Sequence, residues 1–174
     1  MWIEEEQYYR VIESKTAKLF DSCMEAGGES SCASMRQVSA LRTFGLHLGM
    51  CFQIKDDIFD YSDSEDIGKP TMNDIRDGKV TLPLIIALKR ASKEEAEHIR
   101  SIAEELANHS EHINKDIIEQ EIKSFVLRFD GIRYAYQQIH WHQKRAIEAL
   151  QVFHDSPIKQ HLLMLLEYTI YRIQ

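Results

Sequence analysis

Three aspartates with helical spacing are the residues of this sequence best suited to do chemistry. Asp56 and Asp57 are adjacent and Asp60 follows about one turn later, so on a helix their carboxylates project within roughly 100° of one another. Such charges repel one another and, near the end of a helix, oppose its dipole. A cation would offset both effects, and oxygen-only ligands are typical of Mg²⁺. The cluster therefore predicts a magnesium site in which the ion bridges a carboxylate and a substrate phosphate.

An ordinary acidic surface is the alternative explanation of this cluster. Residues 56–66 hold six acidic residues and no Lys or Arg, and such runs are commonly solvent-exposed. The apolar context favours the metal site, because unneutralised charge is costly at a core boundary. The apolar residues that surround the aspartates are Phe52, Ile54, Ile58 and Phe59.

Two lysines follow the aspartates in a segment that contains Gly68, Pro70 and Gly78. Lys69 and Lys79 could hold a phosphate from the side opposite the metal. Either lysine taken singly is better explained as an ordinary exposed side chain. The length of this segment, residues 62–80, indicates a functional loop.

Helices are the elements that must position these groups. Glycine (7) and proline (3) are scarce, and no alternating strand pattern occurs, so the sequence predicts an all-α fold. The predicted helices cover residues 4–26, 34–61, 81–88, 92–108, 116–129, 132–153 and 156–172.

Particular residues predict how these helices end and pack. Gly27-Gly28 should terminate the first helix, whereas a capping box should open the helix at Ser92. Thr81 and Ser156 should each cap a helix that has a proline in its first turn. Gly45 and Gly49 lie four residues apart on one helix, which predicts that another backbone packs closely against them.

Composition limits the class of protein. A net charge of −7 argues against nucleic acid as the main partner. Three cysteines without CxxC spacing indicate free thiols and a cytoplasmic location. The longest uncharged apolar stretch, residues 82–88, is too short to cross a bilayer. His140 and His142 lie two apart on a predicted helix, so they favour packing over a metal pair.

Three motifs follow one another along the chain: F-Q-x-x-D-D-x-x-D from Phe52, then G-K-P, then N-D-I-x-x-G-K-x-T-L-P ending at Pro83. Together and in this order they closely resemble the motifs of the trans-isoprenyl diphosphate synthases, the polyprenyl synthetase family. Residues 9–17 look like the family's lysine-threonine helix, and residues 166–172 are similar to its usual ending. The resemblance implies that residues 1–174 form a single domain, the C-terminal half of an isoprenoid-synthase helical bundle. By the same resemblance this half carries the second Asp-rich motif, and the bacterial look of the family pattern implies a long-chain, octaprenyl-type enzyme.

The resemblance also implies the role of each site residue. Mg²⁺ would be held by Asp56, Asp57 and Asp60; the allylic diphosphate would be contacted by Lys15, Lys69 and Lys79; the developing allylic cation would be flanked by Thr16 and Gln53. The implied reaction is Mg²⁺-dependent transfer of an allylic prenyl group to isopentenyl diphosphate.

The sequence departs from the family in length. Family members are roughly twice as long, and we find no second DDxxD, no arginine pair following one and no Gly-Lys-Arg site for isopentenyl diphosphate. We therefore expect a fragment that is inactive without the N-terminal half, and that associates with that half or with copies of itself. The alternatives are a regulatory, non-catalytic subunit of a heteromeric prenyltransferase and a terpene cyclase. A plain helical interaction module is the least favoured.

Overall fold

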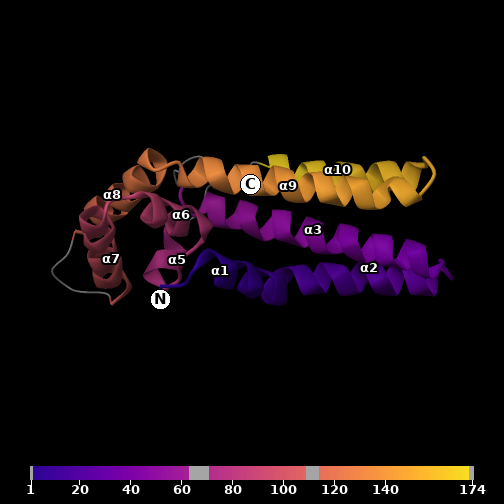
Figure 1. Cartoon of the computed structure of the whole chain (residues 1–174), viewed down its shortest axis with the longest axis horizontal. Helices are drawn as coiled ribbons and strands as arrows, with labels where there is room; N and C mark the ends of the chain where they lie inside the picture. The colour runs from indigo at the N-terminus through magenta and orange to yellow at the C-terminus, as the bar shows by residue number, and fades with distance from the viewer. Residues whose placement is uncertain (1, 63–70, 109–113, 173–174) are drawn as a thin grey trace. The chain divides into compact units, whose positions relative to one another are not determined.

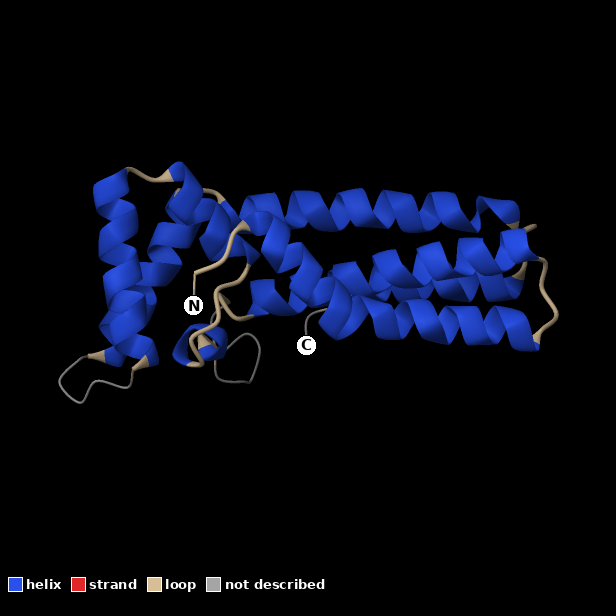
Figure 2. Cartoon of the chain, turned by 60° about the horizontal axis from the view of Figure 1, so that its bottom comes forward, coloured by secondary structure: helices blue, strands red, loops and turns tan. Residues whose placement is uncertain are grey.

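The computed structural model describes residues 2–62, 71–108 and 114–172, and the regular elements within these ranges are all helical (Figure 2). The all-α prediction is thus confirmed for the described residues. The chain divides into two compact units, one formed by residues 1–8, 56–135 and 174 and the other by residues 9–55 and 136–173. The single domain expected over residues 1–174 stays a prediction.

Figure 1 labels the helices in chain order. Their bounds are α1 Glu5–Ile12, the π-helical turn η1 Glu13–Ala17, α2 Lys18–Ser30, α3 Met35–Phe59, α5 Asn73–Arg76, α6 Leu82–Arg90, α7 Lys93–Ala107, α8 Lys115–Arg128, α9 Gly131–Ala149, the 3₁₀ turn η2 Leu150–Val152 and α10 Pro157–Tyr171. No helix in the described ranges combines the length and the apolar character that crossing a membrane requires.

The unit of residues 9–55 and 136–173 is a bundle of long helices. Figures 1 and 2 show α2, most of α3, α9 and α10 running alongside one another. Apolar side chains fill the space between them, because each helix buries one stripe of its surface. The fully buried members of this core include Phe44, Leu48, Cys51, Ile54, Ile139, Ala146, Leu150, Leu166 and Ile170.

Two glycines of α3 allow α2 and η1 to approach closely, as the sequence predicts. A Cβ atom at Gly45 would lie 2.5 Å from the backbone oxygen of Phe20, and one at Gly49 would lie 2.6 Å from the Cα of Ala17. Both distances are far shorter than a van der Waals contact between such atoms. Glycine at these positions therefore sets the spacing of the two helices.

The predicted end of the first helix at Gly27-Gly28 is wrong. The helix α2 continues through both glycines to Ser30. A Cβ atom at Gly28 would lie 3.1 Å from Leu41 and 3.2 Å from Val38, so Gly28 serves close packing against α3. Tertiary packing has overridden the local preference of glycine to end a helix.

The unit of residues 1–8 and 56–135 is centred on α6. Seven consecutive residues of this helix, residues 82–88, are buried, and α7 and α8 pack against it. A helix that is apolar on all sides must be enclosed. Thr81 occupies the N-cap position without a capping hydrogen bond, because its hydroxyl lies 3.2 Å from the buried hydroxyl of Tyr61.

Two predicted helix starts are confirmed. Ser92 and Glu95 form a reciprocal capping box at the start of α7. The Ser156 hydroxyl accepts a hydrogen bond from the backbone N–H of Lys159 at the start of α10. Both pairs lie three residues apart, so local sequence suffices to specify them.

A pair of histidines lies inside the long-helix unit. The Nδ1 atoms of His47 and His142 are 2.8 Å apart, and His142 is 6% exposed. One ring must donate and the other accept, so the accepting ring is neutral. Burial, and to a smaller extent the nearby His47, lowers the pKa of His142 to about 3. Burial, and to a smaller extent the charge of Arg145, also lowers the pKa of His47. The sequence favoured packing for His142, and its burial beside His47 is such a packing role.

Mild acid should destabilise the protein through His142. In the unfolded state His142 becomes protonated near pH 6.5, whereas in the folded state it stays neutral until about pH 3. The free energy of unfolding therefore falls as the pH decreases through this window. Between about pH 7.5 and about pH 5 we expect a loss of about 2 kcal/mol in the free energy of unfolding, measured by urea denaturation. His142→Gln should reduce the loss, and an unchanged pH dependence in that variant would contradict this assignment.

Candidate functional site

Two aspartates, Asp56 and Asp57, lie in the last turn of α3 and differ in exposure. Asp56 is half-buried, whereas Asp57 is 3% exposed. The Asp57 carboxylate accepts a hydrogen bond of 2.6 Å from the hydroxyl of Tyr8 in α1. A buried carboxylate requires such partners because its transfer from water is costly. Tyr8 thereby fixes the orientation of the Asp57 side chain.

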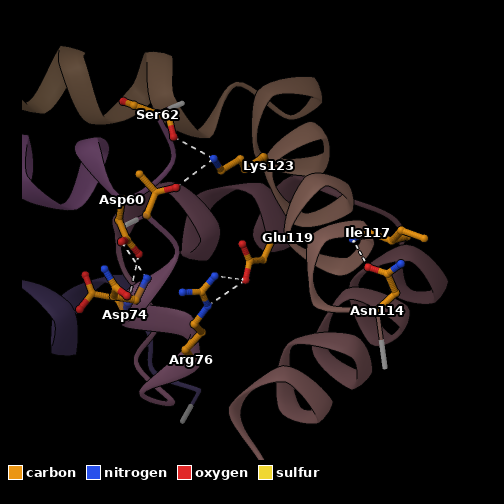
Figure 3. Close-up of polar contacts among 10 residues, drawn as sticks. Asp60, Ser62, Asp74, Arg76, Asn114, Ile117, Glu119 and Lys123 are labelled. Atoms are coloured by element: carbon orange, nitrogen blue, oxygen red, sulfur yellow. Dashed lines mark hydrogen bonds and ion pairs between the residues drawn. The ribbon is translucent and has the colours of Figure 1, made fainter. Parts of the chain in front are cut away.

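Asp60 follows directly after α3 and connects it to α5. Its Oδ1 accepts a hydrogen bond of 2.9 Å from the backbone N–H of Asn73, and its Oδ2 accepts one of 3.1 Å from that of Asp74 (Figure 3). Its backbone oxygen accepts a further bond of 2.9 Å from the N–H of Met72. Asp60 thus provides the cap of α5 from a distant part of the sequence.

The environment of Asp60 is electrostatically unfavourable for a negative charge. Burial, and then the neighbouring carboxylate of Asp74, raise the pKa of Asp60, while the two backbone amides and the charge of Arg76 act in the opposite direction. A cation near this carboxylate would favour its ionised form. The electrostatics of Asp60 therefore agree with a site that receives positive charge.

The donor atoms suit a hard divalent cation. Mg²⁺ prefers oxygen ligands and is commonly held by one or two carboxylates plus waters and substrate phosphates. In residues 2–62, 71–108 and 114–172, no three His, Cys, Asp or Glu side chains are grouped as a metal cage. The carboxylates present fit an ion that takes its other ligands from a diphosphate. The assignment of Asp56, Asp57 and Asp60 as ligands stays a prediction.

In the long-helix unit, η1 brings together two of the predicted residues. The Thr16 hydroxyl donates a hydrogen bond of 2.6 Å to the side-chain oxygen of Gln53, although 37 residues separate them. The π-helical turn is a local widening of the helix that often occurs at functional sites. Lys15 lies in the same turn and its side chain is exposed. Because Thr16 uses its hydrogen on Gln53, its oxygen lone pairs are the part suited to face a developing cation.

Of the two predicted loop lysines, Lys69 and Lys79, only Lys79 lies within the described residues. Lys79 is exposed, and its Nζ lies 2.8 Å from Asp77 and 3.6 Å from Asp74. The hydrogen bond to Asp77 raises the pKa of Lys79, so this side chain is cationic. Lys69 lies outside the described residues. Contact of either lysine with a diphosphate stays a prediction.

Several residues that support these side chains were not expected from the sequence. Tyr8 holds Asp57 across 49 positions, and the amides of Asn73 and Asp74 hold Asp60. In the sequence Tyr8 has only the spacing of a core residue, so it gives no signal of this bond. The sequence also gives no clear signal that Asp60 caps α5, because the residue that caps a helix normally lies directly beside its first turn.

Comparison with known proteins supplies a family context. The family model of the polyprenyl synthetases matches residues 2–120. The octaprenyl diphosphate synthase of Escherichia coli (strain K12) is 32% identical over 171 residues, which are 98% of this chain and 51% of that protein. The short chain isoprenyl diphosphate synthase of Methanothermobacter thermautotrophicus is 33% identical over 171 residues, 98% of this chain and 50% of that protein. The chain thus spans about half the length of these relatives.

Solved structures agree with the sequence comparison. The geranylgeranyl pyrophosphate synthase from Bacteroides thetaiotaomicron has a TM-score of 0.85 and 38% identity, covering 97% of this chain and 54% of that one. The polyprenyl synthase from Caulobacter crescentus CB15, complexed with calcium and isoprenyl diphosphate, has a TM-score of 0.86 and 28% identity, covering 99% and 51%. These neighbours extend the similarity to nearly every described helix.

Proposed function

Because the chain belongs to the polyprenyl synthetase family, we propose that it forms the C-terminal half of a prenyltransferase that elongates isoprenoid chains. The observation that carries this proposal is the placement of Asp56, Asp57 and Asp60 at the end of α3, within the segment matched by the family model. The substrates would be an allylic prenyl diphosphate and isopentenyl diphosphate. Its relatives make products of different lengths, so an octaprenyl product is one expectation among several.

The described residues suggest how this half would assist ionisation of the allylic substrate. Mg²⁺, when bound, would offset the negative charge that accumulates on the departing diphosphate. Asp56, Asp57 and Asp60 would hold that ion, with Asp57 oriented by Tyr8 and Asp60 oriented by the backbone amides of Asn73 and Asp74. Support for a divalent cation comes from the calcium present in the Caulobacter structure.

Cationic side chains and one hydroxyl would complete this half-site. Lys15 and Lys79 are exposed and would contact the diphosphate together with Lys69. Positive charge placed beforehand at the leaving group lowers the barrier because it interacts more strongly with the transition state than with the substrate. Thr16, held by Gln53, would direct oxygen lone pairs at the allylic cation.

The two alternative functions receive no specific support. The relatives and neighbours named above are all prenyl diphosphate or polyprenyl synthases, which disfavours a terpene cyclase. A regulatory subunit without turnover would not need a buried, oriented carboxylate such as Asp57, whose burial costs stability. The prenyltransferase is therefore the function we propose.

We also propose that this half associates through an apolar face of α10. Five large apolar side chains of that helix are between 44% and 73% exposed, namely Ile158, Met164, Leu165, Tyr168 and Tyr171. Met164, Tyr168 and Tyr171 follow one another at intervals of four and three residues, so they share one side of the helix, and exposed stripes of this kind mark interfaces. The occupant would be the N-terminal half or a second copy.

We further propose a cytoplasmic location. The free thiols of Cys23, Cys32 and Cys51 support it, because thiols stay reduced in the cytoplasm.

A prenyl-transfer assay tests the proposed function. Labelled isopentenyl diphosphate, farnesyl diphosphate and Mg²⁺ would be supplied to the 174 residues alone and to a mixture with the N-terminal half of the E. coli relative. We expect little product from the chain alone, labelled product from the mixture, and none after chelation of the metal. In parallel, calorimetry should detect Mg²⁺-dependent binding of inorganic pyrophosphate by the chain itself. The absence of both product and binding would refute the proposal.

A further inference from the structure

One face of α8 is tied to both chain segments that flank residues 63–70. Glu119 and Lys123 lie one turn apart on this helix, so their side chains share a face. Glu119 accepts a hydrogen bond of 2.8 Å from the Nε of Arg76 in α5 (Figure 3). The contact joins α8 to the helix whose backbone amides are held by Asp60.

Lys123 makes the second connection, and it bridges two segments at once. Its Nζ donates a hydrogen bond of 2.8 Å to the backbone oxygen of Ser62 and one of 3.2 Å to the hydroxyl of Thr71. Ser62 comes two residues after Asp60, and Thr71 comes immediately before Met72. A single ammonium group therefore bridges the two segments, and Figure 3 shows Lys123 reaching toward Ser62.

The bridged segment after residue 70 is held in an unfavourable conformation. Met72 is fully buried and has a φ of 61°, which is costly for a residue that carries a Cβ atom. Such a backbone persists only where the surroundings determine it. The surroundings here are Asp60, which accepts the N–H of Met72, and Lys123, which holds Thr71.

We propose that Lys123 is a positioning residue for the Asp60 carboxylate. By holding Ser62 and Thr71 together, it keeps the amides of Asn73 and Asp74 within hydrogen-bonding distance of Asp60 and thereby fixes the orientation of that carboxylate. Glu119 supports the same arrangement through Arg76. This inference rests on the proposed function, because it assigns Asp60 to the metal–diphosphate site, but its structural part can be measured independently.

The test compares Lys123→Met with Lys115→Met. Lys115 lies on the same helix and is exposed, so it controls for the loss of a positive charge from α8. Two quantities are measured: hydrogen exchange at the amides of Asn73 and Asp74, and Mg²⁺-dependent binding of inorganic pyrophosphate. In Lys123→Met we expect exchange at both amides to rise about tenfold and the dissociation constant to rise about tenfold, as for other groups that orient metal ligands. Lys115→Met should change neither.

Two further variants separate positioning from general stabilisation. Thr71→Val removes one acceptor of Lys123, so it should have a smaller effect and should add nothing when combined with Lys123→Met. Lys123→Arg keeps donors for both acceptors and should restore most of the binding. A uniform rise in exchange that also includes the core amides of Ile122 and Val126 would show a merely structural role and overturn the proposal.

The outcomes also distinguish this inference from the proposed function. Normal pyrophosphate binding and normal exchange in Lys123→Met would overturn the inference alone. Failure of the unsubstituted protein to bind pyrophosphate with Mg²⁺ would count against the proposed function, and exchange at Asn73 and Asp74 would then decide whether Lys123 holds the two segments.

Discussion

Asp56→Asn should abolish most of the Mg²⁺-dependent binding of pyrophosphate while leaving the fold intact. The substitution replaces a charged ligand by a neutral amide of the same shape, and we expect the dissociation constant to rise by about 100-fold, the upper range seen when groups around a metal are altered. Prenyl transfer by the reconstituted enzyme should fall by at least the same factor, because the metal matters most in the transition state. Calorimetry and the labelled-substrate assay would measure the two effects.

The stability of the same variant is the more discriminating result. Asp56 is half-buried in the last turn of α3, where a negative charge opposes the helix dipole. Its loss should therefore keep the free energy of unfolding within about 0.5 kcal/mol of the original value. A residue whose replacement removes function but not stability is serving the site rather than the fold.

Asp57→Asn supplies the contrast, and Asp116→Asn the control. Asp57 is buried and bound to Tyr8, so weakening that bond should lower stability by about 1–3 kcal/mol in addition to reducing binding. Asp116 is exposed in the first turn of α8 and has no place in the site, so its substitution should leave binding unchanged and lower stability by no more than about 0.5 kcal/mol, through the lost interaction with the helix dipole. If Asp56→Asn bound Mg²⁺ and pyrophosphate as tightly as Asp116→Asn did, Asp56 would not be a ligand.

Features encoded within a few residues were predictable from the sequence. The capping box at Ser92 and the cap at Ser156 each depend on a partner three residues away. The close approach at Gly45 and Gly49 was predictable because glycine inside a helix is costly without a packing reason. At Gly28 the sequence predicted a helix end instead, and the contacts that a Cβ atom would make with Leu41 and Val38 show why that prediction was wrong.

Partners distant in sequence explain most of what could not be predicted. The bond between Thr16 and Gln53 was not predicted: the family resemblance implied only that both residues flank the allylic cation, and no local pattern connects residues 37 positions apart. Lys123 contacts Ser62 and Thr71 across 61 and 52 positions, and in the sequence nothing distinguishes it from Lys115, the other lysine of the same helix. Electrostatic and metal-site arguments identify which carboxylates need a hydrogen-bond donor or a cation nearby. Only the packed structure shows which neighbouring residue provides it.

The same glycine-to-alanine substitution should have opposite effects at Gly49 and Gly27. In α2, a Cβ atom at Gly27 would meet nothing within 4 Å, so alanine should stabilise the protein by up to about 1 kcal/mol through its higher helix propensity. At Gly49 a Cβ atom would lie 2.6 Å from the Cα of Ala17 and 3.0 Å from the ring of Phe20. Relieving that overlap should cost about 1–3 kcal/mol and outweigh the gain in propensity.

The position of Gly49 links this loss of stability to the candidate site. Ala17 is the last residue of η1 and adjoins Thr16, so moving it away from α3 should lengthen the 2.6 Å hydrogen bond between Thr16 and Gln53. A double-mutant cycle that combines Thr16→Val with a substitution of Gln53 measures this bond. The coupling is the non-additive part of the change in the free energy of unfolding, obtained by urea denaturation. In Gly49→Ala we expect the coupling of Thr16 with Gln53 to shrink, while in Gly27→Ala it should be unchanged. Equal stability changes of the same sign in the two glycine variants would show that α3 does not depend on close contact with η1, and the geometry we assign to Thr16 would lose its support.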